Sequence, residues 1–121
     1  MSEQTVSFVK SMVSLHPELG AILEEHIKDN LGEILPHVFF GDVARYTSSL
    51  FPAAPRGGLL LRRELRDLLD YLEATYSSGD EELRELISVS FLENLPRPGE
   101  LGAQIREMLG PNLSRQLRVI G

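Results

Sequence analysis

The sequence predicts an all-α fold: a compact bundle of about six to seven helices that forms a single domain over residues 1–121. Apolar residues recur at spacings of three and four along most of the chain, which is the period of an amphipathic helix. Short stretches rich in proline and glycine divide these periodic segments. No stretch shows a convincing strand pattern. With 42% apolar and 25% charged residues, the chain has the composition of a globular domain.

The first two helices are separated by a proline. A helix is expected over residues 3–15, where Phe8 and Met12 share an apolar face. Pro17 ends this helix, because the residue before a proline is pushed out of the α region, and it can occupy the first turn of the next helix. His26 is expected on the apolar side of the second helix, and residues 30–32 (Asn-Leu-Gly) are expected to end that helix.

A central helix is expected from Asn30 to about Phe51. Asn30 and Glu33 have the spacing of a capping box, with Asn in place of Ser or Thr. Gly41 lies in the middle of this segment, where glycine costs about 1 kcal/mol relative to alanine. Either the helix breaks there, or another element packs too closely for a Cβ. The residues expected on the apolar face are Ile34, Leu35, Val38, Phe39, Val43 and Tyr46.

The second half begins with the clearest loop in the chain, residues 52–58. A helix is expected over residues 59–76, then a turn, and then a helix that Asp80 caps. This pair resembles one unit of a HEAT-type repeat. Two further helices are expected over residues 100–109 and 112–119. The residues expected to face the core are Leu83, Leu86, Ile87, Ser90, Phe91, Leu95, Leu101, Ile105, Leu113 and Leu117, with Met108 or Leu109.

Composition and charge exclude several classes of site. The chain has no cysteine, which excludes disulfides, thiolate metal sites and cysteine nucleophiles. A net charge of −6 argues against a general nucleic-acid binder. We see no signal peptide, and no apolar run approaches the roughly 18 residues of a membrane span. We therefore expect a cytoplasmic protein with no cofactor and no contact with nucleic acid or membrane.

Four polar residues suggest a metal site. Glu25, Asp29, Glu33 and His37 recur every four residues, so a continuous helix would place them on one face. Carboxylates and an imidazole arranged in this way can bind a divalent transition metal. The expected break at residues 30–32 argues against this, and leaves capping roles for Asp29 and Glu33.

A second candidate is a general acid–base pair. His37 and Asp42 are five residues apart, and a bend at Gly41 would bring them together. Alternatively, Asp42 pairs with Arg45 or Tyr46, or caps a helix that restarts after Gly41. The sequence contains no nucleophile elbow and no glycine-rich phosphate loop.

Two segments carry a resemblance to a known family. Residues 29–42 (DNLGEILPHVFFGD) and 90–95 (SFLENL) together resemble a family of small bacterial helical proteins of unknown function, over residues 16–109. Proteins of this size, acidity and layout are also similar to immunity proteins of bacterial toxin systems. This similarity implies a shared polar binding site at the motif positions Glu33, His37, Asp42, Glu93 and Asn94; alternatively, the motifs mark the core and turns of the fold.

The leading hypothesis is a protein-binding domain that uses its acidic surface. Up to residue 55 the chain has three Lys or Arg residues and seven Asp or Glu residues, so the first half suits a partner with a basic surface. Such a surface also serves solubility. The specific form of the hypothesis is an immunity protein that neutralises a toxin. The alternatives are a metal-dependent or small-molecule-binding enzyme that uses Glu33, His37 and Asp42, and a homo-oligomeric structural module. The sequence leaves the oligomeric state open.

Overall fold

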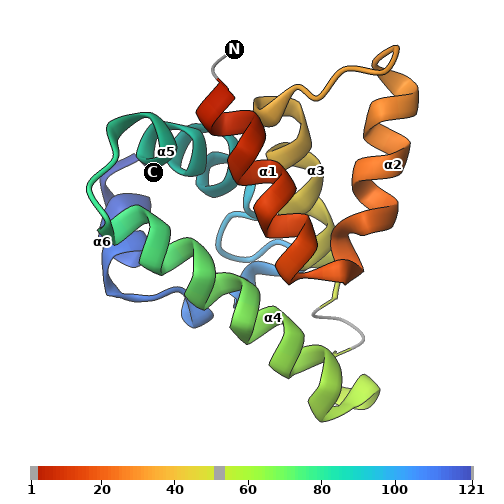
Figure 1. Ribbon diagram of the computed structural model, residues 1–121. Helices are drawn as coiled ribbons and strands as arrows, with labels where there is room; N and C mark the ends of the chain where they lie inside the picture. Colours follow the sequence, from red (N-terminus) through yellow and green to blue (C-terminus); the bar gives the residue numbers. More distant parts are fainter. Residues whose placement is uncertain (1–2, 51–53, 121) are drawn as a thin grey trace.

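The computed structural model describes residues 3–50 and 54–120, with side chains described from residue 63 onward in the second range. Within these ranges the fold is all-α, which confirms the predicted class, and contains no strand (Figure 1). The elements are α1 (Glu3–Leu15), the 3-10 helix η1 (Pro17–Leu19), α2 (Gly20–Asp29), α3 (Pro36–Ser49), α4 (Ala54–Ser77), α5 (Glu81–Leu86), the π-helix η2 (Ile87–Phe91), the 3-10 helices η3 (Leu92–Asn94) and η4 (Ala103–Met108), and α6 (Pro111–Ile120).

Helix α3 occupies the centre of the molecule. It contacts α1, α2, α5 and the three segments η2, η3 and η4. In Figure 1, α2 stands on one side of α3, α5 and α6 lie on the other, and the long helix α4 runs along the lower edge. The prediction that this helix is the central one is therefore confirmed.

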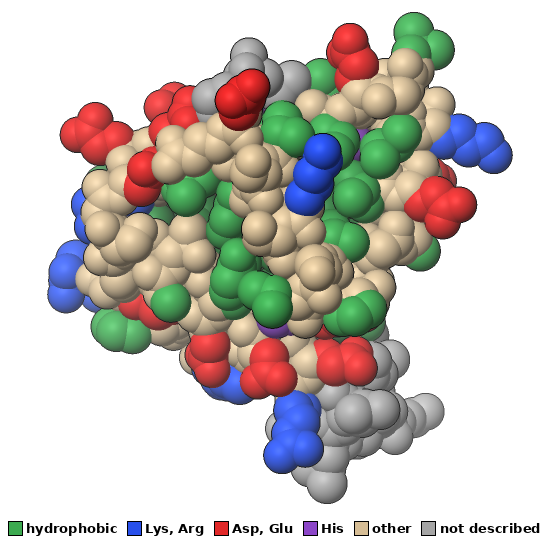
Figure 2. All heavy atoms as spheres, viewed as in Figure 1, with side chains coloured by type: hydrophobic (Ala, Val, Ile, Leu, Met, Phe, Trp, Pro, Cys, Tyr) green, Lys and Arg blue, Asp and Glu red, His purple; other side chains and the backbone are tan. Residues whose placement is uncertain are grey.

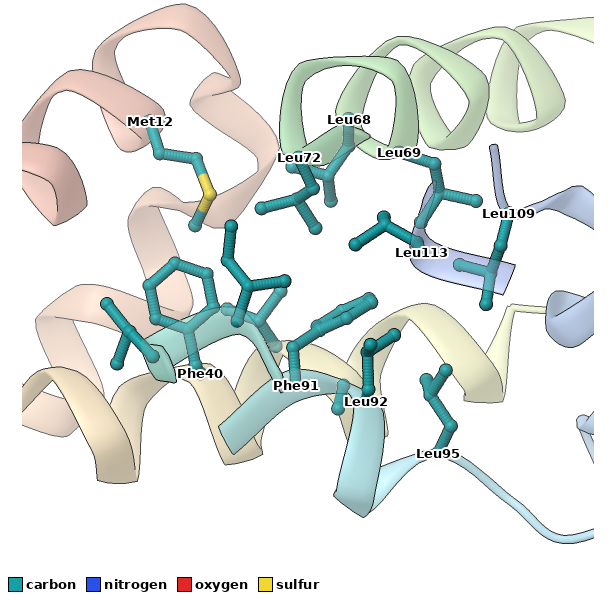
Figure 3. Packing of buried hydrophobic residues seen from close by; sticks show 14 of the residues in the cluster. Met12, Phe40, Leu68, Leu69, Leu72, Phe91, Leu92, Leu95, Leu109 and Leu113 are labelled. Carbon is teal, nitrogen blue, oxygen red and sulfur yellow. The ribbon is translucent and has the colours of Figure 1, made fainter. Parts of the chain in front are cut away.

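One hydrophobic core joins these elements. Phe8 of α1 stacks on Phe40 of α3, with 5.6 Å between the ring centroids. In Figure 3, Phe40 and Phe91 lie on the side of the core opposite Met12 and the leucines Leu68, Leu69 and Leu72 of α4. The largest side chains that are fully buried are Phe39, Phe40, Phe91, Met12, Leu19, Leu68, Leu69, Leu72, Leu86, Ile87, Leu92 and Ile105.

The start of α3 differs from the prediction. The helix begins at Pro36, and Leu35 before it is extended, because the residue that precedes a proline avoids the α region. The backbone N–H of Glu33 donates to the carbonyl of Asn30 in a turn (3.1 Å), so the expected capping box is wrong. The helix ends at Ser49, and the expected end at Phe51 lies outside the described residues.

Two other expectations are wrong. Helix α4 begins at Ala54, so residues 54–58 are helical and not part of a loop; Pro55 is tolerated because first-turn amides need no helical partner. Residues 52–53 lie outside the described ranges. Val38 is 47% exposed and Leu101 is 82% exposed, although both were expected to face the core. Val38 lies in the first turn of α3, and Leu101 lies in the connection before η4.

The segment after Asp80 is not one regular helix. Asp80 caps α5, as predicted, by accepting a hydrogen bond from the backbone N–H of Leu83 (3.0 Å). The helix then widens into the π-helix η2 and tightens into η3. Ser88 and Ser90 on η2 are both buried, because Ser88 contacts Gln116 of α6 and Ser90 contacts His37 of α3. Among the described helices, none is both long and apolar enough to cross a membrane.

Candidate functional site

The two motif segments meet where α3 packs against η2. The imidazole Nδ1 of His37 lies 2.5 Å from the hydroxyl oxygen of Ser90. His37 is exposed near the start of α3, whereas Ser90 is only 3% exposed. A serine and a histidine at this distance form the first half of a nucleophile–base arrangement. The burial of Ser90 gives the contact a packing role, because a substrate cannot approach a hydroxyl enclosed between helices.

Asn94 completes the contacts around Ser90. Its side-chain Nδ2 donates to the carbonyl oxygen of Ser90 (2.7 Å), which caps the end of the π-helix. The same Nδ2 atom lies 3.6 Å from the position that a Cβ on Gly41 would occupy. Helix α3 continues through Gly41, so the alternative of a helix break is wrong. The other alternative, an element packed too closely for a Cβ, is wrong as well, because a Cβ on Gly41 would have ordinary contact distances of 3.4 to 3.6 Å.

Asp42 pairs with a cation and not with the histidine. Its Oδ1 accepts a hydrogen bond from Nη2 of Arg45 (2.5 Å), as one of the alternatives predicted. Glu33 is exposed on the turn before α3. Glu93 is exposed on η3, where it lines a different hollow. Of the five predicted site residues, the structure therefore joins only His37 and Asn94, through Ser90.

The predicted metal constellation is divided among three places. Glu25 and Asp29 lie on α2, Glu33 lies on the turn, and His37 lies against Ser90. They do not share one face, because the chain leaves the helix after Asp29. Within residues 3–50 and 63–120, no group of three or more His, Asp or Glu side chains is placed to hold a metal ion.

An acidic cleft lies between α2 and α3. Its volume is about 270 Å³, and it is lined by Ile22, Glu25, His26, Asp29, Asp42 and Arg45. Three carboxylates face one guanidinium, so acidic groups outnumber basic ones among the Asp, Glu and Arg side chains of the lining. Outside the cleft, the pKa of Tyr46 on α3 is raised by burial and then by the carboxylates of Glu18 and Glu64.

His26 is the site residue that sequence reasoning placed only as part of a helix face. It is 2% exposed, and its Nε2 accepts a hydrogen bond from the backbone N–H of Leu35 (2.9 Å). Its own carbonyl accepts one from Nδ2 of Asn30 (2.7 Å). The ring also packs edge-on against Phe39. His26 thereby fixes both ends of the turn that leads from α2 into α3. The available signal was a histidine on the apolar side of α2.

Comparison with known proteins gives a family. Residues 9–119 match the family described as a domain of unknown function, DUF7674. The chain belongs to this family. The expected resemblance to a family of unknown function is confirmed at that level. The DUF7674 match covers α2, α3 and η2, and so includes both the cleft and the contacts of Ser90. No curated protein and no solved structure matches the chain.

Proposed function

We propose that this domain binds a protein with a basic surface through the acidic cleft between α2 and α3. The observation that carries the proposal is the lining of the cleft, in which Glu25, Asp29 and Asp42 face Arg45 alone. Arg45 already binds Asp42, which leaves the carboxylates of Glu25 and Asp29 to attract a cation from outside. The net charge of −6 adds a long-range attraction for a basic partner.

The size of the cleft favours a side chain over a metabolite. Pockets for small molecules have volumes of roughly 300–1,000 Å³ and are mostly apolar. This cleft, at about 270 Å³, is smaller, and five of its six lining residues have ionisable side chains, namely three acids, one arginine and one histidine. A lysine or arginine of a partner would fit against Glu25 and Asp29. Binding of this kind speeds association and weakens as salt rises.

The specific form of the proposal is an immunity protein that neutralises a bacterial toxin by direct binding. Such a protein needs a stable scaffold with a strongly charged docking surface and no chemistry of its own. The single core, the net charge and the cleft all support this role.

Affinity capture with charge-matched variants tests the proposal. The double variant Glu25→Gln/Asp29→Asn removes two charges from the cleft, and Glu81→Gln/Glu85→Gln removes two exposed charges from α5. In lysate of the source cells, the wild type and the α5 variant should retain one basic protein that the cleft variant loses. The purified pair should bind at least ten-fold more weakly at 500 mM than at 50 mM NaCl. Affinity independent of both salt and the cleft charges would refute the proposal. Toxicity of the partner, relieved by co-expression, would establish the immunity role.

The alternative is a metal-dependent or small-molecule-binding enzyme that uses Glu33, His37 and Asp42. The contact of His37 with Ser90 is the observation in its favour. It has less support, because Asp42 binds Arg45 and Glu33 lies on the turn before α3. Addition of Zn²⁺, Mn²⁺ or Fe²⁺ to the dialysed protein would raise its melting temperature if the alternative holds, and His37→Ala would abolish the rise.

A further inference from the structure

The turn between α2 and α3 holds a leucine in an unfavourable backbone conformation. Leu31 has φ +57°, and it is the one non-glycine residue with positive φ in the described part of the chain. The N–H of Gly32 donates to the carbonyl of Ile27 (2.8 Å), which closes a Schellman turn at the end of α2. Glycine normally occupies the left-handed position of this turn. Here glycine comes one residue later, so Leu31 takes the conformation that L-residues disfavour.

The side chain of Leu31 makes almost no packing contact within the fold that could offset the backbone strain. It is 95% exposed, more than any other large hydrophobic residue whose exposure the structure describes. Figure 2 shows a hydrophobic side chain that stands out from the turn between α2 and α3. A non-glycine residue held in the left-handed region is a strained position of the kind that occurs at functional sites.

The turn is nevertheless held firmly. His26 binds the backbone N–H of Leu35 at one end of the turn and the side chain of Asn30 at the other. The backbone N–H of Glu33 donates to the carbonyl of Asn30 between them (3.1 Å). These bonds fix the backbone of the turn on both sides of Leu31, so little backbone conformational entropy would be lost when its side chain enters a partner.

Acidic residues flank the leucine. Asp29 and Glu33 lie two residues before and after Leu31, and both are exposed. Asp29 also lines the acidic cleft, so the apolar tip and the cleft form one continuous surface. A complementary surface would have an apolar pocket with lysine or arginine side chains on its rim. A second copy of this chain fits poorly, because each copy carries a net charge of −6.

We propose that Leu31 is the apolar anchor by which the domain docks into a basic-rimmed pocket of its protein partner. This inference rests on the proposed function and adds the chemistry of the partner. The anchor supplies buried apolar area at the centre of the contact, and the carboxylates of Asp29, Glu33 and Glu25 supply orientation and selectivity around it.

A synthetic host with the same chemistry gives a test that needs no identified partner. The probe is β-cyclodextrin with an ammonium group on each glucose unit, which is an apolar cavity with a cationic rim; neutral β-cyclodextrin is the control. Calorimetric titrations should show at least five-fold tighter binding of the ammonium host, and the methyl NMR signals of Leu31 in the wild type should shift on binding. Leu31→Asn should abolish the binding, whereas Leu101→Asn, which removes another exposed leucine, should leave it unchanged. Equal affinity for the two hosts, or no shift at Leu31, would overturn the proposal.

The partner obtained by affinity capture gives the second arm. Leu31→Gly should raise the melting temperature by about 3–5 °C, because glycine accepts positive φ, and yet weaken partner binding at least ten-fold. Leu31→Met should keep the affinity within about three-fold. Binding that depends on Glu25 and Asp29 but not on Leu31 would refute the anchor and leave the acidic surface standing. Binding that depends on neither would refute both. If the wild type self-associates and Leu31→Asn does not, the occupant of the anchor is a second copy of this chain, and the proposed partner is refuted.

Discussion

Replacement of Glu73 by glutamine is expected to lower the free energy of unfolding by about 1–3 kcal/mol. Glu73 lies on α4, and its carboxylate caps the start of α6. Oε1 accepts from the backbone N–H of Leu113 (3.0 Å), and Oε2 accepts from the backbone N–H and the side-chain Nδ2 of Asn112 (3.1 and 2.9 Å). Glu73 therefore joins two helices that are far apart in sequence.

The expected loss in the free energy of unfolding is estimated from the interactions of the Glu73 carboxylate that a glutamine side chain cannot make. Hydrogen bonds to a charged acceptor contribute about 1.5–3 kcal/mol, and a negative charge at a helix N-terminus contributes about 0.3–1 kcal/mol more. Glutamine keeps one acceptor oxygen, but its NH₂ group would face a backbone donor. Partial solvent exposure screens part of the loss, which gives the lower end of the expected range.

The pH dependence has a defined sign. Burial raises the pKa of Glu73, but hydrogen bonds from the amides of Leu113 and Asn112 and from the side chains of Asn112 and Ser77 outweigh it and hold the pKa below its ordinary value of 4.5. The carboxylate therefore stabilises the fold fully above pH 4.5, and this stabilisation is lost as the pH falls through the lower pKa of the folded state. The difference between wild type and Glu73→Gln should shrink on acidification.

Urea denaturation followed by circular dichroism at pH 7 and pH 3.5 measures this effect. The exposed Glu107 provides the control, since Glu107→Gln makes the same chemical change elsewhere and should shift the midpoint very little. Equal stability of Glu73→Gln and the wild type at pH 7 would refute the capping argument. A difference that stays constant at pH 3.5 would show that its cause is packing and not charge.

Three further substitutions follow from the geometry, each measured by the same denaturation assay. Gly110→Ala should destabilise by about 1–2 kcal/mol, because its Cβ would lie 2.6 Å from the Glu73 side chain, and the cost should vanish in a Glu73→Ala background. Gly102→Ala should cost about 2–4 kcal/mol, because φ is +87° and the Cβ would lie 2.6 Å from the carbonyl of Ser48; a loss below 1 kcal/mol would contradict this contact. His26→Ala should cost about 2–4 kcal/mol, and His26→Gln, which keeps an acceptor, should cost less.

The local features of the fold were predictable because they depend on neighbours in sequence. Pro17 separates the first two helices as expected, and Asp80 caps α5 through an amide three residues away. The apolar period placed Leu113 and Leu117 in the core from the last helix. The start of α3 was predicted at Asn30 from a possible capping box, but the helix begins at Pro36. The residues before it form a turn, in which the N–H of Gly32 donates to the carbonyl of Ile27.

The candidate site was less predictable, because its contacts join residues that only packing brings together. The prediction of a metal site was wrong because α2 ends at Asp29, so the four residues do not lie on one helix. His37 and Asn94, two of the five motif residues, both contact Ser90 on a π-helix, and no spacing rule indicates a π-helix. His26 was seen as part of a helix face, and Leu31 only as part of a helix end. His26 matters because it is buried and accepts a hydrogen bond from the following turn, and Leu31 matters because it is exposed and has a positive φ.

The sequence by itself determined the all-α class, most helix positions and the acidic balance, because side-chain period, capping and charge are properties of short segments. Only the tertiary structure decided that Glu25, Asp29 and Asp42 share a cleft, that His26 fixes the following turn, and that Glu73 caps a helix 39 residues away. The physical reason is that these contacts depend on how the helices pack around the core, and helix positions along the chain leave that packing undetermined.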